Sequence, residues 1–415
     1  MRKTLPTKGR GRDELMAELK ALKGNDTDWQ HGRAPLYVFR GIPGTYEIGR
    51  DAFVEYFTEN ALGAKRAFNS IKRMEDDVVG FGLDLFHAPE GAVGTFTTGG
   101  TESIFLAVKT CRDWSRRQRK DKQHRGNLVM PVTAHPAFDK AAQIMDLEVR
   151  RVPHGPDFRA DPKAMEAAID ADTILLVGSA PNFSFGTIDP IAALGELAQK
   201  RGVWLHVDAC VGGYVAPFVK KIGYPIPDFD FAVPGVMSIS ADLHKFGFCP
   251  KPASTVFYRD QDKHSAQAFV FEGWPNGRYA TETFAGTRAG GGVAASWATM
   301  NFLGVEGYCE TAKRLMAMRD GFVSAIESIP GLHIWGKPDL TIVAIGSNDV
   351  DIHRVAEELA GKGWLPGLLR EPKALHMMMS LIHEDSRATY VADLKAAIAT
   401  VKASSGEKAK IAVTY

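Results

Sequence analysis

A lysine in an apolar setting is the first residue of this sequence that could do chemistry. Lys245 follows His244 and lies close to Phe246 and Phe248 in the segment 238–251. Burying a charged ammonium without a partner is costly, unless the amine is neutral or converted to an imine. A desolvated lysine with a lowered pKa is the form that Schiff-base chemistry requires. Lys245 is therefore a candidate nucleophile, although a lysine taken at random is more often an ordinary surface residue.

Two other segments place polar groups at the ends of predicted elements. Asp208 ends the apolar run 203–207, so its carboxylate is expected at the carboxyl end of a buried strand, where ligands bind in open α/β sheets. Gly100 and Thr101 lie in a turn that closes one apolar run and opens a helix. The free NH groups and positive dipole end of such a helix suit a phosphate. Taken alone, the aspartate could cap a turn and the threonine could be a simple N-cap.

His135 follows the apolar run 127–132 and could stack on an aromatic ring, although a lone histidine is more often structural. Together the four segments match one ligand, pyridoxal 5'-phosphate, which carries a phosphate, a pyridinium nitrogen, a ring face and an aldehyde. An aspartate that keeps the pyridine nitrogen protonated lets the ring accept electrons from a breaking bond at the substrate Cα. The sequence has no HExxH motif and no zinc-type Cys/His spacing, so we expect no catalytic metal.

The elements that must position these residues alternate along the chain. Strands are predicted at 93–98, 127–132, 148–152, 173–178, 203–208, 236–240 and 254–258, and helices near 101–118, 136–146, 161–170 and 189–201. This alternation predicts an α/β fold with a large, mostly parallel seven-stranded sheet.

The rest of the chain predicts an arm at one end and a smaller domain at the other. After the Gly-rich stretch 286–292, a long helix to about 328 precedes a shorter pattern of strand, strand, helix, strand, helix, with strands at 340–345 and 374–382. We expect an N-terminal arm with helices over 1–60 and a large cofactor-binding domain over 61–300. A linking helix and a small C-terminal α/β domain should occupy 301–415.

Composition narrows the kinds of partner. The 415 residues carry a formal net charge of +1, so no global field attracts nucleic acid or an anionic membrane. A small-molecule amine is the expected partner. The four cysteines form no CxxC pair, which favours a reducing compartment and a cytoplasmic location. No apolar run is long enough for a transmembrane segment.

At these segments the sequence resembles the sphingosine phosphate lyases, within the wider group of pyridoxal-phosphate-dependent amino-acid decarboxylases. The resemblance runs from about residue 30 to 400, and its specific stretches are 98–103, 206–213, 238–251 and 283–292. It implies the type I pyridoxal-phosphate enzyme fold, a homodimer with a shared active site, and retro-aldol cleavage of a phosphorylated amino alcohol to an aldehyde and phosphoethanolamine.

The resemblance also implies roles for individual residues. Lys245 would form the internal aldimine, Asp208 would meet the pyridine nitrogen and His135 would stack on the ring. Tyr279 matches a family tyrosine near the cofactor and is a candidate for proton transfer. The residues that would hold the cofactor phosphate are Gly100, Thr101, His244 and Thr287 of the partner subunit.

The match weakens where the family binds the substrate phosphate, with a tyrosine, a histidine and a lysine. Only the lysine is present, as Lys251; Phe39 stands at the tyrosine position, two residues after Tyr37, and Gly63 stands at the histidine position. Phenyl and glycine offer no side-chain donor. We therefore hypothesise a different anion, such as a carboxylate paired with Arg278, although that arginine could equally be a solvated loop residue.

Three functions remain open at this point. The first is a carbon–carbon lyase that acts on an amino alcohol or a β-hydroxy amino acid. The second is an amino-acid α-decarboxylase, which differs only in the Cα bond held perpendicular to the cofactor ring. The third is a catalytically silent relative, which predicts a decayed cofactor site, yet Lys245, Asp208, His135 and the glycine turn are all present.

Overall fold

The structure, a computed structural model, describes residues 2–404 and 408–414. Its large sheet has the strand order β1-β7-β6-β5-β4-β2-β3. The strands are β1 (Val93–Thr97), β2 (Asn127–Pro131), β3 (Glu148–Val152), β4 (Thr173–Ser179), β5 (Trp204–Asp208), β6 (Val236–Ala241) and β7 (Ser254–Tyr258). β7 runs antiparallel to β1 and β6, and the other neighbours pair in parallel. The predicted seven-stranded sheet is confirmed, and each predicted strand agrees to within one residue at either end.

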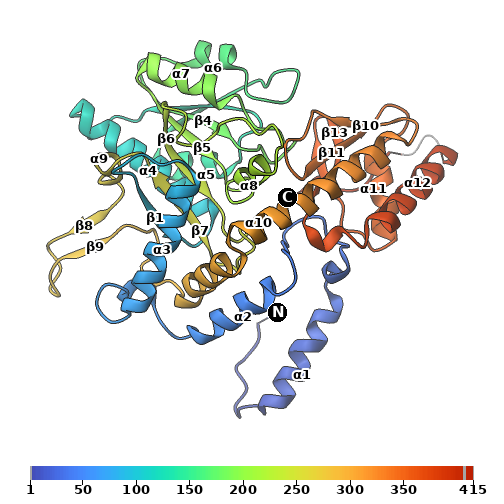
Figure 1. The fold of residues 1–415 in the computed structure, drawn as a ribbon, viewed down its shortest axis with the longest axis horizontal. Coiled ribbons are helices and arrows are strands. Elements are labelled where there is room, and N and C mark those ends of the chain that lie inside the picture. Colours follow the sequence, from blue (N-terminus) through green and yellow to red (C-terminus); the bar gives the residue numbers. More distant parts are fainter. Residues whose placement is uncertain (1, 405–407, 415) are drawn as a thin grey trace.

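Helices cover both faces of this sheet (Figure 1). They are α4 (Gly100–Arg119), α5 (Ala137–Met145), α6 (Pro162–Ala168), α7 (Ile191–Arg201), α8 (Ala216–Lys221) and α9 (Gln261–His264). Successive strand residues point to opposite faces. Thus Leu176 packs in one core with α6 and α7, while Val177 packs in the other with α4 and α5. The strands inside the sheet are buried on both sides, as their apolar runs predicted, whereas the edge strands β1 and β3 are only partly buried.

A second, smaller sheet follows a long helix (Figure 1). Helix α10 (Gly290–Glu327) is interrupted at Gly304 and packs against α2 (Thr45–Glu55) and α3 (Asn69–Leu85). The antiparallel small sheet has the order β10-β11-β13-β12. Its elements are β10 (Leu332–Trp335), β11 (Ile342–Ser347), α11 (Ile352–Gly361), β12 (Gly367–Arg370), β13 (Lys373–Met378) and α12 (Arg387–Ala403).

Some of the local predictions differ from the structure. The expected strand 374–382 ends at Met378, and the separate strand β12 was missed. β12 is short and only partly buried, so it lacks the apolar run that marked the strands of the large sheet. Helix α2 lies within the arm that was expected to contain helices, but its bounds were not predicted. Helix α3 and the hairpin of β8 (Phe269–Phe271) and β9 (Tyr279–Thr281) were not predicted. The domain limits at residues 60 and 300 stay predictions.

Two elements extend away from the body of the molecule (Figure 1). One is α1 (Arg12–Leu22), in which no residue is buried. The other is the β8–β9 hairpin, where Phe269, Val270 and Phe271 are all exposed. Within the described part of the chain, we find no helix with both the length and the apolar character needed to cross a membrane.

A close approach between two glycines links α7 to the turn before β6, the strand that leads to Lys245. A Cβ on Gly235 would lie 2.2 Å from the carbonyl oxygen of Gly195, a backbone atom of α7. We expect Gly235→Ala to lower the free energy of unfolding by about 1–3 kcal/mol, because backbone must move to make room. Chemical denaturation measures the change.

The matched control is Gly80→Ala, at an exposed position of α3 where an added Cβ would meet nothing within 4 Å. That replacement should be neutral or stabilise the protein by up to about 1 kcal/mol, the helix propensity gained by alanine. Equal effects of the two replacements would contradict the close approach.

Candidate active site

A cavity of about 200 Å³ lies where β4, β5 and β6 end. The carboxyl ends of parallel strands are the usual place for a ligand in such a sheet. The lining residues are Gly100, Thr101, Ile104, His135, Ser179, Pro181, Phe183, Asp208, Cys210, Val211, Asp242, His244 and Lys245. The structure therefore brings together six of the predicted site residues, from segments that are far apart in the sequence.

Asp208, at the end of β5, is held by a backbone hydrogen bond. Its Oδ1 accepts a hydrogen bond from the backbone N–H of Cys210 at 3.0 Å. The carboxylate also borders the cavity that contains Lys245. Beneath it, both ring nitrogens of His206 contact serine hydroxyls of β6, those of Ser238 at 2.8 Å and Ser240 at 3.1 Å. Burial lowers the pKa of His206 to about 4, so this imidazole is neutral and fixes the register of β5 against β6.

Lys245 is paired with a carboxylate that sequence analysis had not singled out. Its Nζ lies 3.0 Å from Oδ2 of Asp242, three residues earlier, and the lysine side chain is 19% exposed. Burial lowers the pKa of Lys245, but Asp242, Cys210 and Asp208 raise it by more, so the net pKa is above the usual value. The expectation of a lysine with a lowered pKa is therefore wrong for the chain without cofactor, because burial is compensated by an ion pair.

The carboxylate of Asp242 is itself buried and fixed. Ser254 of β7 donates from its Oγ to Oδ1 at 2.5 Å. Burial raises the pKa of Asp242, but Lys245 and His244 lower it by more, so its net pKa is below the usual value. A Cβ on Gly100 would lie 2.7 Å from Oδ2, so a side chain there would displace the carboxylate. Glycine at the start of α4 thus permits this close approach.

The start of α4 fits the phosphate of the expected cofactor. The helix begins at Gly100, no side chain caps it, and its first residues Gly100 and Thr101 line the cavity. The first backbone NH groups of a helix have no partner within the helix and suit a phosphate. His244 lies beside this helix start, and its Nδ1 donates to the carbonyl oxygen of Ala253 at 2.7 Å. Burial lowers the pKa of His244. A lysine, a carboxylate, an imidazole and an uncapped helix start together fit pyridoxal 5'-phosphate.

A second carboxylate that was missed, Glu102, ties this turn to a distant loop. Its Oε2 accepts from the backbone N–H and the hydroxyl of Thr98, at 2.7 and 2.6 Å. Its Oε1 accepts from the backbone N–H groups of Phe284 and Ala285, at 2.9 and 3.3 Å. The motif at 98–103 contained this residue, but only the folded chain shows what its side chain binds.

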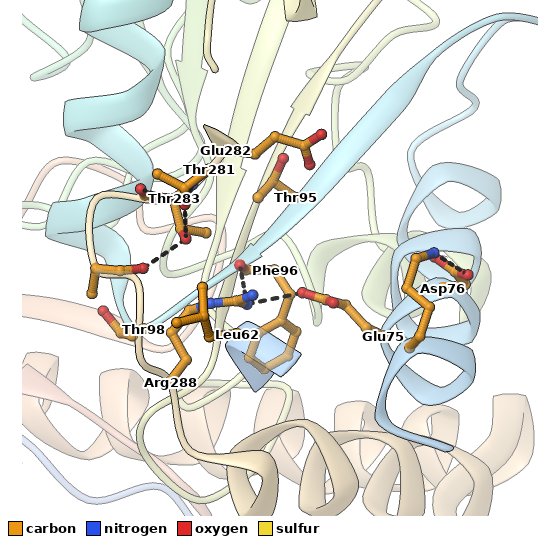
Figure 2. Close-up of polar contacts among 12 residues, drawn as sticks. Leu62, Glu75, Asp76, Thr95, Phe96, Thr98, Thr281, Glu282, Thr283 and Arg288 are labelled. Carbon is orange, nitrogen blue, oxygen red and sulfur yellow. Dashed lines mark hydrogen bonds and ion pairs between the residues drawn. The ribbon is translucent and has the colours of Figure 1, made fainter. Parts of the chain in front are cut away.

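The loop that carries Thr287 is also fixed from its other end. Figure 2 shows Arg288 reaching Glu75 of α3, at 2.9 Å, and the carbonyl oxygen of Phe96. The Thr287 hydroxyl accepts a hydrogen bond from Nδ2 of Asn60 at 3.2 Å. Thr287 does not line the Lys245 cavity of its own chain.

The remaining predicted residues lie in two other places. Arg278 and Tyr279 belong to the β8–β9 hairpin, outside the Lys245 cavity, and Arg278 is exposed and paired with Glu272 at 3.0 Å. Lys251 donates from Nζ to the carbonyl oxygen of Tyr37 at 3.2 Å. Burial, and then the charge of Lys245, lower the pKa of Lys251. The functional roles of these four residues stay predictions.

Removing the charge of Asp242 tests its control of the lysine. We expect cofactor-free Asp242→Asn protein to attach pyridoxal phosphate covalently at a lower pH than the unchanged chain. Burial still lowers the pKa of Lys245 in this variant, but the negative charge of Asp242 no longer raises it. The pH of half-maximal rate should fall by about one unit or more. Borohydride reduction followed by mass spectrometry measures the adduct. Ser254→Ala keeps the Asp242 charge and should leave this midpoint nearly unchanged; a common midpoint for all three proteins would contradict the assignment.

Comparison with known proteins identifies the family. Residues 70–346 match the pyridoxal-dependent decarboxylase conserved domain. The chain is 40% identical to a sphingosine-1-phosphate lyase of Oryza sativa subsp. japonica, over 98% of this chain and 76% of that protein. It is 34% identical to a probable L-aspartate decarboxylase of Pyrococcus furiosus, over 86% of this chain and 93% of that protein.

A solved structure agrees with these sequence relatives. The sphingosine-1-phosphate lyase of Burkholderia pseudomallei K96243 superposes with a TM-score of 0.92 at 35% identity, covering 97% of this chain and 94% of that one. The type I fold, the cofactor and the enzymatic character expected from the resemblance are thereby confirmed. The chain belongs to the pyridoxal-dependent decarboxylase family and is a lyase that uses pyridoxal 5'-phosphate.

Proposed function

We propose that this enzyme cleaves a carbon–carbon bond of a phosphorylated long-chain amino alcohol, such as sphingosine phosphate, to a fatty aldehyde and phosphoethanolamine. The relatives named sphingosine-1-phosphate lyase, similar over nearly the whole chain, support this reaction. One structural observation carries the choice of a phosphorylated substrate: a basic cavity adjoins the Lys245 cavity.

The basic cavity has a volume of about 450 Å³ and shares His244 with the Lys245 cavity. Lys23, Arg40, Arg50 and Lys251 line it, and its lining includes no carboxylate side chain. Guanidinium groups hold phosphates through paired hydrogen bonds. Arg40 can thus supply the donors that phenylalanine and glycine at the family's tyrosine and histidine positions lack. Arg50 is paired with Asp51 through Nε and Nη2, and its Nη1 can supply another.

The alternative anion, a carboxylate paired with Arg278, has less support. Arg278 is already paired with Glu272, is exposed to solvent, and lies outside both the Lys245 cavity and the basic cavity. α-Decarboxylation, the reaction named for the probable L-aspartate decarboxylase of Pyrococcus furiosus, would use the same cofactor and fold. The basic cavity favours the phosphorylated amino alcohol over an amino acid.

The chain's own residues divide the work. When bound, pyridoxal phosphate supplies the ring that accepts electrons from the breaking bond. We propose that Lys245 would bind its aldehyde carbon, that the carboxylate of Asp208 would accept a hydrogen bond from its ring nitrogen, and that His135 would contact its ring. Gly100, Thr101 and His244 would hold its phosphate. Lys251 and the two arginines would bind and orient the substrate phosphate.

The same assignment requires a second copy of the chain. Tyr279 and Thr287 lie outside the Lys245 cavity of their own chain, so we propose that they act in the cavity of the neighbouring copy. Large apolar side chains are exposed near them, with Phe284 77% and Phe57 72% exposed, and such patches mark protein interfaces. A homodimer with shared active sites satisfies both observations. Four unpaired cysteines support a reducing, cytoplasmic setting.

Product analysis tests the reaction. With sphingosine phosphate, the purified enzyme should release a long-chain aldehyde and phosphoethanolamine without carbon dioxide. Lys245→Ala should lower kcat by about a thousandfold or more, since no other lysine lines its cavity in the described chain. Lys200→Ala, at an exposed lysine of α7, is the matched control. Carbon dioxide from an amino acid, with no aldehyde, would support the decarboxylase alternative.

The basic cavity gives a separate prediction. Arg40→Ala and Lys251→Ala should each raise KM for sphingosine phosphate by about tenfold to a hundredfold, the loss expected for one charge-assisted contact. The unphosphorylated amino alcohol should not respond. Lys20→Ala, in the exposed helix α1, is the control. A rise in KM for a β-hydroxy amino acid that is confined to Arg278→Ala would instead favour the carboxylate hypothesis.

A further inference from the structure

We infer that a cavity closed by the C-terminal segment 408–414 binds the alkyl chain of the substrate. The inference rests on the proposed function, because only a long-chain substrate needs such a site. According to this inference, segment 408–414 contributes to selecting substrates by the length of their alkyl chain.

The cavity is large, and no acidic residue, lysine or arginine of the described chain lines it. Its volume is about 560 Å³, within the range of about 300–1,000 Å³ that is typical of small-molecule sites. The lining residues are Leu36, Tyr37, His135, Pro136, Phe183, Leu365, Pro366, Gly367, Leu368, Leu369, His376, Ile411, Ala412, Val413 and Thr414. No aspartate, glutamate, lysine or arginine is among them, so the lining suits hydrocarbon.

The polar groups in this lining are largely accounted for. Nε2 of His376 donates to the carbonyl oxygen of Phe183 at 2.6 Å, and the two rings lie 4.6 Å apart. Burial lowers the pKa of His376 to about 4, so the imidazole is uncharged at neutral pH. The same effect of burial lowers the pKa of His135. A chain of methylene groups would therefore meet no charge there.

The apolar cavity adjoins the reacting centre. His135 and Phe183 line both this cavity and the cavity that contains Lys245. The basic cavity adjoins the same centre through His244. The Lys245 cavity is thus adjoined by a cavity with cationic side chains and by an apolar cavity. A phosphorylated long-chain amine likewise has an anionic group and a hydrocarbon chain, which these two cavities could bind.

The wall formed by the end of the chain is held by a single carboxylate. Glu357 of α11 accepts hydrogen bonds through Oε1 from the backbone N–H groups of Lys410 and Ile411, the latter at 2.7 Å. Ile411 and Val413 are half-buried, whereas Lys408 and Lys410 are exposed. The segment therefore presents its apolar side chains to the cavity and its lysines to solvent.

Chain-length dependence tests the assignment. Each methylene buried in the cavity should lower KM about fourfold. We expect Val413→Asp, and deletion of residues 408–415, to lower kcat/KM for sphingosine phosphate by tenfold or more. The same changes should leave a short-chain phosphorylated analogue within about twofold, because that analogue does not reach the cavity. Lys408→Gln changes the charge of the same segment by the same one unit at an exposed position, and it should leave kcat/KM for both substrates unchanged.

Two results would overturn the inference. One is an unchanged preference for the long chain in both variants, and the other is an equal loss for long and short substrates. An enzyme that retains bound cofactor but cleaves neither phosphorylated substrate would contradict the proposed function instead.

A binding measurement independent of turnover completes the test. In the Lys245→Ala protein, sphingosine phosphate should slow tryptic cleavage after Lys408 and Lys410, because a filled cavity holds the segment in place. The short-chain analogue should not protect these bonds. Equal protection by the two ligands, or none by either, would contradict a site for the alkyl chain.

Discussion

The buried ion pair of Lys245 and Asp242 is the interaction on which the site depends. An ammonium inside a cavity needs a counter-charge, and Asp242 supplies it at 3.0 Å. Three elements meet at this carboxylate: Asp242 directly follows β6, Ser254 of β7 donates to it, and α4 begins with a glycine that leaves it room. The pair therefore sets how closely the helix start, and with it the phosphate seat, approaches the lysine.

Around that ion pair, the fold forms three cavities of different chemical character. The central cavity presents the polar groups that fit pyridoxal phosphate, the basic cavity presents Lys251 with two arginines, and the apolar cavity presents aliphatic side chains. A substrate with an anion, an amine and a hydrocarbon chain would match all three. Reaction type follows from the family and cofactor, whereas substrate choice follows from the cavities that adjoin them.

The single chain holds only part of the proposed machinery. Glu102 and Arg288 fix the loop that carries Thr287, yet that threonine does not line the cavity of Lys245 in its own chain. The hairpin with Tyr279 likewise extends from the body (Figure 1). In a proposed site shared between two copies, each copy must hold these residues in a fixed position for its partner. The contacts that anchor the Thr287 loop fit this requirement.

The sequence by itself determined the large sheet and the cofactor. Its inner strands are buried on both faces and stand out as apolar runs; Asp208 ends one of them, and Lys245 lies four residues after another. Only the tertiary structure decided the partners of those residues. Asp242, Glu102 and Arg40 carry no local signal, and the apolar cavity joins residue 36 to residue 414. Local patterns record burial and backbone preference, whereas contacts between distant segments exist only once the chain has packed.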